Sequence, residues 1–173
     1  LFNHHNEISD IKLSKSSELL AFSQNSQVRI HSLNYRMVFP SRSNQAVLLT
    51  HKNRVMSISF SPSSTLLASA SVGEIRVAHT EACREICHFD YHIKPIYDIS
   101  FDDNNFFLAA ASHDRTISMW AMNNVGMIRQ FIGHKQPVVK TLFVPMRPNS
   151  GSNLSLISAS TDSKIRLWDV GTA

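Results

Sequence analysis

Several residue types that would give this chain an obvious chemistry are scarce. It has two cysteines, Cys83 and Cys87, among 173 residues, which excludes a disulfide framework and is typical of a reducing compartment. No apolar run approaches the roughly 18 residues that a membrane-spanning helix needs, so we expect no contact with a membrane. The five glycines are scattered, and the chain has neither a phosphate-binding loop nor a Gly-x-Ser-x-Gly turn. We therefore predict no enzyme, no cofactor and no small-molecule substrate.

The basic residues are not clustered as a nucleic-acid surface requires. The chain has 17 Lys/Arg against 13 Asp/Glu, a formal net charge of +4. Residues 1–60 hold seven of the basic residues against three acids, and residues 61–173 hold ten of each. Proteins that bind nucleic acid usually gather Lys and Arg on one face or one helix. The composition thus argues against nucleic acid as a direct ligand.

Nine histidines raise the question of a metal site. The segment "HTEACREICHFDYH" brings His79, Cys83, Cys87, His88 and His92 close together in the sequence. On a β-strand, however, two cysteines in a Cys-x3-Cys spacing lie about 13 Å apart. Zinc needs its ligands within about 2.0–2.3 Å of the metal. We therefore predict structural roles for these residues and no metal site.

What the chain does contain is an internal repeat. Four similar segments begin at a histidine: "HHNEISDIKLS" at His4, "HKNRVMSISFS" at His51, "HIKPIYDISFD" at His92 and "HKQPVVKTLFV" at His134. Apolar residues stand four and nine positions after each histidine, and in three segments also seven positions after it. Steps of three and then two do not fit a regular strand, whose period is two. They indicate a strand with a one-residue β-bulge that keeps these side chains on the buried face.

Further strands follow each of these segments. Second strands are expected at "ELLAFSQ", "TLLASAS", "FFLAAAS" and "LSLISAS", and third strands at "QVRIHSL", "EIRVAHT", "TISMWAM" and "KIRLWDV". Short polar turns separate them, and weaker fourth strands are expected at "ACREICHF" and "GMIRQFIGH". Four short strands in about 40–45 residues are typical of one propeller blade. We place the units at 4–36, 51–80, 92–122 and 134–170 of a single repeat region, 1–173, with loop insertions at 37–50 and 145–153.

These units resemble the WD40 repeat family. The last unit carries "GH" at Gly133–His134, "SASTD" at Ser158–Asp162 and "IRLWD" at Ile165–Asp169, and the third carries "SHD" at Ser112–Asp114 followed by Trp120. The resemblance implies an all-β WD40-type β-propeller with about four blades present. Because propellers of this family usually have about seven blades, we expect these four to form part of a larger one.

In that family the histidine, a serine or threonine, the turn aspartate and the tryptophan form a buried hydrogen-bonded network within a blade. Such a network is physically sound, because a buried indole N–H needs an acceptor and a buried carboxylate needs donors. The matching residues of the last unit are His134, Asp162, Trp168 and either Ser158 or Ser160; those of the third are His92, Ser112, Asp114 and Trp120, with Ala110 where Ser158 would stand. The recurrence of the set favours a structural role over a catalytic triad.

The first two units depart from this pattern. The first has Asn25 and His31 in place of the acid and the indole. The second has Ala78 at the indole position, and its turn, "SVGE", lacks the aspartate. We expect no network in the second unit, so that this blade depends on packing alone.

With these groups assigned to structure, we expect a non-catalytic scaffold that binds other proteins. Binding residues concentrate on loops held by a rigid framework, and in the WD40 family partners often dock on the face that carries the histidine and aspartate loops. The loop residues of the types favoured in interfaces are Arg54, Met56, Tyr97 and His113, which we predict as contacts.

One narrower resemblance concerns the subgroup. The stretch "YDISFDDNNFFLAAASHDRTISMWA", followed by "IRQFIGH", is most similar to the WD40 subunits of transcription factor IID and related coactivator complexes. This resemblance implies a nuclear protein with histone-fold partners. Two alternatives remain open: a substrate-recognition subunit of a ubiquitin ligase and a direct nucleic-acid binder, with the cytoplasm as the alternative compartment.

Overall fold

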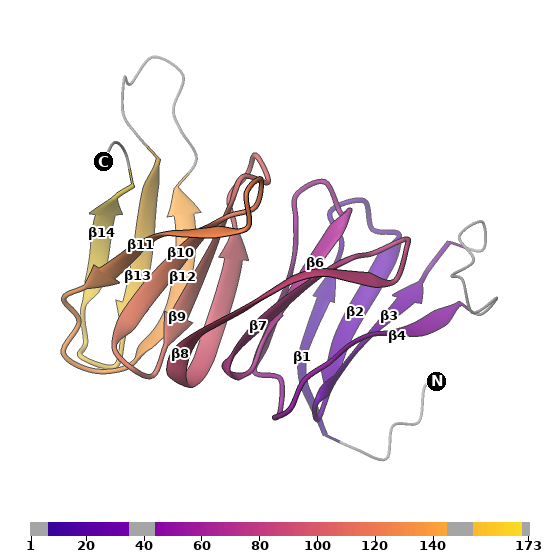
Figure 1. Ribbon diagram of the computed structural model, residues 1–173, viewed down its shortest axis with the longest axis horizontal. Helices are drawn as coiled ribbons and strands as arrows, with labels where there is room; N and C mark the ends of the chain where they lie inside the picture. Colours follow the sequence, from indigo (N-terminus) through magenta and orange to yellow (C-terminus); the bar gives the residue numbers. More distant parts are fainter. Residues whose placement is uncertain (1–6, 35–43, 145–153, 171–173) are drawn as a thin grey trace.

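The computed structural model describes residues 7–34, 44–144 and 154–170. Fourteen β-strands fill these ranges, in sheets of four, seven and three strands in which all neighbours are antiparallel (Figure 1). The first sheet holds β1 (Ile8–Leu13), β2 (Leu19–Gln24), β3 (Gln27–Ser32) and β4 (Gln45–Thr50). The second holds β5 (Ser57–Phe60), β6 (Leu66–Ala70), β7 (Val72–His79), β8 (Arg84–Phe101), β9 (Phe107–Ser112), β10 (Thr116–Ala121) and β11 (Gly126–Ile132). The third holds β12 (Val138–Val144), β13 (Ser155–Ser160) and β14 (Ile165–Asp169).

The seven-stranded sheet consists of two blades that share the long strand β8. The first half of β8 pairs with β7 from Arg84 to Asp90 and, after a register shift, at Pro95, and its second half, from Ile96, pairs with β9. We therefore number four blades: blade 1 (β1–β4), blade 2 (β5–β7 and the first half of β8), blade 3 (the second half of β8 and β9–β11) and blade 4 (β12–β14). The all-β propeller architecture predicted from the repeat is confirmed.

The expected insertion at 37–50 needs a correction. Gln45–Thr50 is β4, the fourth strand of blade 1, and it pairs with β3. Its apolar residues Leu48 and Leu49 are buried, so this segment is part of the blade rather than a loop. Residues 37–43 of the expected insertion, and the whole of the other at 145–153, lie outside the described residues.

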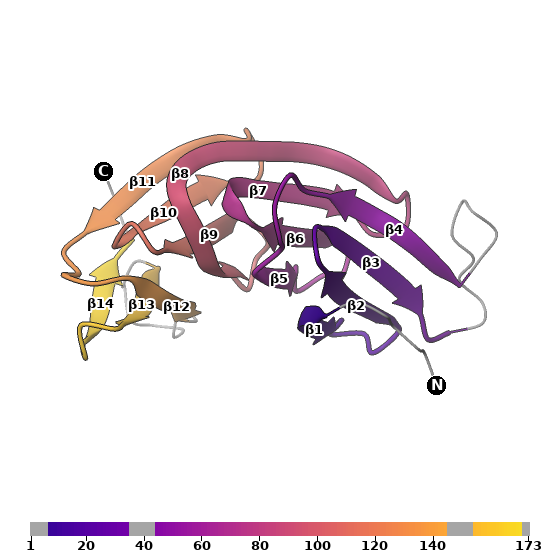
Figure 2. The same cartoon turned by 90° about the horizontal axis from the view of Figure 1, so that it is seen from below.

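The blades follow one another along an arc (Figure 2). The first strands β1, β5 and β12 lie on its concave side, whereas β4, the first half of β8 and β11 lie on its convex side. Three buried apolar clusters fill the spaces between successive blades, centred on residues such as Ile58, Ile99 and Leu156. Each blade thus packs one sheet face against the next blade. No helix of the described part of the chain is long and apolar enough to cross a membrane.

The register shifts that the apolar spacing predicted are present in three first strands. They fall between Ile8 and Asp10 in β1, between Ile96 and Asp98 in β8, and between Val138 and Lys140 in β12. In blades 3 and 4 the shift keeps the spaced residues buried, as expected.

Blade 1 is different, because Ile11 and Leu13 are 56% and 53% exposed although we expected them to be buried. The cause is that no described sheet covers this side of β1 and β2. The opposite side of blade 4 is equally uncovered, with Leu142, Ile165 and Leu167 at 63%, 77% and 69% exposure. We call these two uncovered surfaces the end faces.

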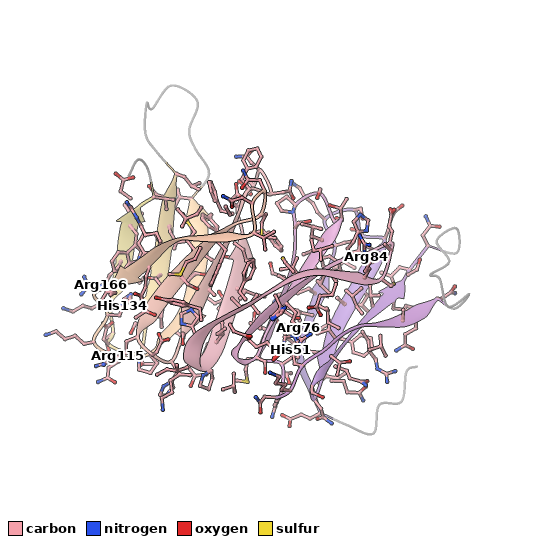
Figure 3. All side chains as sticks on the ribbon, in the orientation of Figure 1. His51, Arg76, Arg84, Arg115, His134 and Arg166 are labelled. Carbon is pink, nitrogen blue, oxygen red and sulfur yellow. The ribbon has the colours of Figure 1, made fainter. Side chains whose placement is uncertain are left out.

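One end of every blade carries a tight hairpin with a residue in the left-handed backbone region. These residues are Asn25 (φ 53°), Gly73 (φ 75°), Arg115 (φ 75°) and Ser163 (φ 64°). His51, His92 and His134 lie at the same end of the blades, which we call the histidine end. This end points downward in Figure 3, where Arg115 and His134 are labelled. Gly73 must be glycine, since a Cβ there would lie 2.6 Å from the carbonyl oxygen of His92.

Candidate functional site

Blade 4 contains a complete chain of hydrogen bonds. His134 lies with Nδ1 2.9 Å from Oδ2 of Asp162 and Nε2 2.8 Å from Oγ of Ser158. The indole Nε1 of Trp168 donates to the same Oγ at 2.8 Å. Since that hydroxyl accepts from the indole, its own proton is directed to Nε2, and the Nδ1 proton is directed to Asp162. Ser160 lies outside this chain and binds the carbonyl of Gln136 and the backbone N–H of Asp162.

Blade 3 contains the same chain with a different serine. His92 contacts Asp114 at 2.6 Å and the hydroxyl of Ser118 at 2.8 Å, and Trp120 Nε1 donates to Ser118 at 3.0 Å. Ser112, which we expected in this place, instead accepts from the N–H of Asp114 and donates to the carbonyl of Pro95. Ser118 can take the position because it pairs across the strands with Ala110, which has no hydroxyl to offer.

Blade 2 has a network where none was expected. His51 Nε2 lies 2.7 Å from Ser69 Oγ, and Nδ1 lies 3.4 Å from a carboxylate oxygen of Glu74. Arg76, labelled next to His51 in Figure 3, donates to Glu74 and also to Glu85 at 2.8 Å. The longer glutamate occupies the place of the missing aspartate from a turn that is one residue shorter, but it forms no hydrogen bond to Nδ1, which is left without a hydrogen-bond partner. The network of this blade is therefore partial, and it also lacks the indole, because Ala78 stands at that position.

In blade 1 the histidine of the repeat, His4, lies outside the described residues. Asn25, at the position of the acid, contributes its backbone carbonyl, which accepts from the N–H of Val55 in blade 2 at 2.8 Å. This bond joins the histidine ends of the first two blades.

The networks shift the acidities of their members. Burial alone would raise the pKa of Asp114, but hydrogen bonds from His92 and Thr116 outweigh it and lower the pKa to about 2. Burial likewise opposes ionisation of Asp162, yet the bonds from the Lys135 backbone and His134 hold its pKa far below the usual range. Burial lowers the pKa of His51 to about 4, and the Glu74 carboxylate offsets this only in part.

These groups are enclosed between blades rather than presented to solvent. Ser118 and Ser158 are 0% and 1% exposed, and each hydroxyl already bonds to an indole and an imidazole. Aromatic side chains of the preceding blade cover the indoles, with Phe89 stacked on Trp120 at 4.3 Å between ring centroids. The arrangement resembles a catalytic triad in composition, but no substrate can reach its serine. What it does is hold the hairpins of the histidine end in place.

Among the described residues, no three His, Cys, Asp or Glu side chains gather as a metal site. Cys83 and Cys87 are unpaired thiols, and burial raises the pKa of each.

The four predicted contact residues lie at the histidine end in different surroundings. The guanidinium of Arg54 forms an ion pair with Glu7 at 2.7 Å and donates to Ser9 at 2.9 Å, so it joins blades 1 and 2. Met56 is half-buried. Tyr97 is half-buried too and stands edge-on to the exposed ring of His113, with 5.8 Å between the ring centroids.

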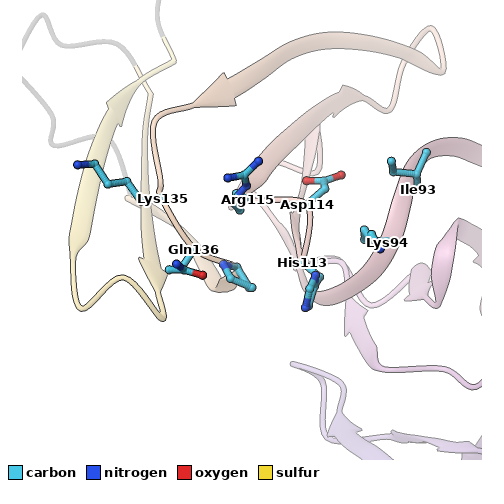
Figure 4. Close-up of a pocket in the computed structure, with 8 residues that line it drawn as sticks. Ile93, Lys94, His113, Asp114, Arg115, Lys135 and Gln136 are labelled. Atoms are coloured by element: carbon cyan, nitrogen blue, oxygen red, sulfur yellow. The ribbon is translucent and has the colours of Figure 1, made fainter.

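A cleft of about 520 Å³ opens at this end between blades 3 and 4. Figure 4 shows Arg115 and Asp114 at its centre, Lys135 and Gln136 on the blade 4 side, and Lys94 and Ile93 on β8. The lining comprises Ile93, Lys94, His113, Asp114, Arg115, Lys135, Gln136 and Pro137. Of the predicted contacts, His113 is the one that borders this cleft.

Two further acidic residues have a structural role that the sequence did not lead us to predict. Asp98 accepts from the N–H of Thr141 at 2.8 Å and from Lys140 at 2.6 Å, so it joins blade 3 to blade 4. Asp10 accepts from the N–H of Ile58 at 3.0 Å and joins blade 1 to blade 2 in the same way. The signal was available, because both acids stand six positions after the histidine of their unit.

The chain matches the family model described as "WD domain, G-beta repeat" over residues 42–74, 83–121 and 126–169. The chain belongs to the WD40 repeat family. Its match to solved structures agrees with this: the crystal structure of the RRP9 WD40 repeats and the structure of U3-55K each superpose with a TM-score of 0.80 over 98% of this chain. Both are 17% identical to it, and it covers 50% and 51% of their lengths.

The curated relatives are more similar in sequence over a shorter range. Nuclear distribution protein PAC1 of Arthroderma otae is 35% identical over 88 residues, and nuclear distribution protein nudF of Aspergillus niger is 34% identical over 84. SIR4-interacting protein SIF2 of Saccharomyces cerevisiae is 33% identical over 79 residues. These matches span 46–47% of this chain but only 14–19% of the relatives.

These relatives bear on the narrower resemblance to transcription factor IID subunits. The family is as predicted, but PAC1 and nudF are nuclear distribution proteins, and the subgroup assignment finds no support in them.

Proposed function

We propose that this WD40 region is a non-catalytic scaffold that binds other proteins through its histidine end. The observation that supports this proposal is that the side chains at the histidine end fall into two groups, one buried and one exposed. The histidine, serine and acid side chains that could do chemistry are buried and bonded to one another within blades 2, 3 and 4. The side chains of the hairpins and entry loops, among them His113 and Lys135, are exposed on a fixed framework.

Tyr97 and His113 form the centre of the proposed contact surface, because their rings already pack against each other and cost little entropy to fix. Arg54 and Met56 stay part of the proposal as its continuation over blades 1 and 2. Since the Arg54 guanidinium is engaged by Glu7, we assign it mainly the ordering of the loops there.

The narrower identity as a nuclear transcription subunit with histone-fold partners rests on the sequence resemblance alone. We propose the broader function, and we leave nucleus and cytoplasm as equal expectations.

The test is partner capture with variants at opposite ends of the blades. Tagged protein carrying Tyr97→Ala and His113→Ala is compared with the unmodified protein and with Phe106→Ala, an exposed residue in the turn between β8 and β9 at the other end. Quantitative mass spectrometry should find partners that the double variant loses and Phe106→Ala retains. An identical set of partners for all three proteins would contradict the proposal.

A ubiquitin-ligase subunit and a nucleic-acid binder are separated in the same experiment. Nuclease treatment removes partners that are held through nucleic acid, and a direct nucleic-acid contact would weaken steeply with salt. Captured ligase subunits, together with partners whose ubiquitylation depends on this protein, would favour the ligase.

A further inference from the structure

We propose that the cleft between blades 3 and 4 binds an extended segment of a partner protein that carries closely spaced anionic side chains, carboxylate or phosphate, beside an apolar one. This inference rests on the proposed function in taking the ligand to be a protein.

The first argument is unbalanced charge. Lys94, Arg115 and Lys135 are exposed along the cleft, and within the described residues none of them takes part in an ion pair. Elsewhere among the described residues some cations are matched, as Lys140 is by Asp98 and Arg76 by Glu74 and Glu85, while others, such as Lys15 and Lys52, form no ion pair but stand apart from one another. The acid in the lining, Asp114, accepts with one carboxylate oxygen from His92 and with the other from Thr116. The cleft therefore has positive charge that is free to meet a ligand.

The second argument is the backbone at Arg115. It adopts a φ of 75°, where the other three hairpins at this end have Asn25, Gly73 and Ser163. Left-handed backbone is unfavourable for a residue with a long side chain and costs glycine nothing. Cys83 and Val125 adopt the same backbone region outside this cleft, with φ of 47° and 55°, so the φ value by itself assigns no role. What sets Arg115 apart is that it is the one residue of the cleft lining with such a backbone, which places a strained residue at the centre of the cleft.

The third argument is the arrangement of the lining. The three cations are spread along the cleft, with Lys135 on one side of Arg115 and Lys94 on the other (Figure 4). Spread charges fit several anionic groups of an extended chain better than one ion. Ile93, 83% exposed beside Lys94, offers an apolar contact at the β8 wall. A nucleic-acid strand would instead call for a longer basic track and aromatic platforms for its bases.

Binding is measured by fluorescence anisotropy with three fluorescein-labelled dodecapeptides of one sequence. Each has one leucine and three variable positions, filled with glutamate, phosphoserine or glutamine. The glutamate or the phosphoserine peptide should bind at least tenfold more tightly than the glutamine peptide, and less tightly at 300 mM than at 50 mM NaCl. The tighter of the two anionic peptides identifies the source of the charge. Equal binding of the glutamine peptide, or no binding of either anionic peptide, would overturn the proposal.

Arg115→Gly separates binding from folding. The variant should bind the anionic peptide at least fivefold more weakly, while its melting temperature stays equal or rises because glycine suits the left-handed backbone. Lys94→Gln and Lys135→Gln should each weaken binding as well. The controls are Lys52→Gln, one residue after the blade 2 histidine, and Lys15→Gln in the β1–β2 turn at the other end; both should bind normally.

Unchanged binding by the triple variant of Lys94, Arg115 and Lys135 would overturn the proposal. So would a single-stranded oligothymidylate that binds more tightly than either anionic peptide and is lost with the same variants. If partner capture through Tyr97 and His113 succeeds while both anionic peptides fail, this inference fails and the proposed function stands. If capture fails, the proposed function fails whatever the peptides do.

Discussion

At the scale of single residues, blades 3 and 4 depend on buried histidine, serine and tryptophan side chains that are hydrogen-bonded to one another. A buried serine hydroxyl that accepts from an indole and donates to an imidazole cannot be removed without leaving both partners short of a bond. Blades 3 and 4 provide this hydroxyl from different strands, Ser118 on β10 and Ser158 on β13, yet reach the same geometry.

Exchanging the serine between strands tests this equivalence. Ser118→Ala should destabilise the protein by about 1–3 kcal/mol, because His92 and Trp120 each lose their hydrogen bond to the serine hydroxyl. Ser112→Ala should cost less, because the hydrogen bonds of Ser112 are longer. Adding Ala110→Ser to Ser118→Ala should recover part of the loss. Chemical denaturation measures all four proteins, and a Ser112→Ala loss larger than that of Ser118→Ala would contradict the assignment.

The indole itself contributes mostly through packing. Trp120→Ala should cost roughly 3–5 kcal/mol, because Trp120 is 7% exposed and stacked on Phe89. Trp168→Ala should cost less, since that side chain is only half-buried. Thermal unfolding of the two variants decides the order, and Trp120→Phe, which keeps most of the apolar area, is the control.

Acid should weaken the protein in two stages. The pKa of His51 falls on folding from 6.5 to about 4, and that of Asp114 falls from 3.8 to about 2. In both cases the unfolded chain binds the proton more tightly, so stability falls as the pH falls, first between about 6.5 and 4 and then between about 4 and 2. The first stage is on the order of 3 kcal/mol.

Denaturant midpoints measured from pH 7.5 to 4.5 test the first stage. His51→Gln should be less stable at pH 7 but should lose less on acidification. His88→Gln, whose side chain is 54% exposed, should follow the unmodified protein. A His51→Gln slope equal to that of the unmodified protein would show that another group controls the transition.

At the scale of elements, the blades are joined by their first strands. The bulges in β1 and β8 turn Asp10 and Asp98 toward the next blade, where each accepts a backbone N–H. Blade 2 has Ser57 at this position of the repeat, and no such carboxylate bond leads from it to blade 3.

Asp98→Ala should therefore cost about 1–3 kcal/mol, since it leaves the N–H of Thr141 without its acceptor and Lys140 without its partner. The matched control is Asp103→Ala in the exposed turn after β8, which should change stability by less than about 0.5 kcal/mol. Both are measured by thermal unfolding. Equal losses would mean that the bond between blades contributes nothing of its own.

The strands and their bulges were largely predictable from the sequence, and the residue roles that were missed share one physical cause. The spacing after the histidines predicted the bulges that are found in β1, β8 and β12, because side-chain direction along one strand follows directly from spacing. Ser118 and Glu74 were missed because their roles depend on what lies opposite on a neighbouring strand and on how far a turn reaches. Linear spacing does not express either quantity. Ala110, which lacks a hydroxyl, was the one hint that another strand must supply it.

At the scale of the whole molecule, the arc leaves apolar residues uncovered at both end faces. Burying Leu142, Ile165 and Leu167 would remove apolar area worth several kcal/mol from water. A protein made of these 173 residues should therefore associate with itself at micromolar concentration. Sedimentation velocity measures this, and Ile165→Lys with Leu167→Lys should reduce association without lowering the melting temperature. Purely monomeric behaviour would show that the end faces are not adhesive.

The shared strand β8 has a kinetic consequence. Its two halves belong to separate hydrogen-bonded ladders, yet no loop between them can act as a hinge. Because the strand is shared, local unfolding of blade 2 should also disrupt blade 3. Hydrogen exchange should therefore report one common free energy of opening for the buried amides of β7 and β10. Blades 1 and 4, which are joined to this pair by side chains and a few loop contacts, should open independently and sooner. The centre of the arc is thus its slowest part to unfold, and the two blades that border open space are the first to fray.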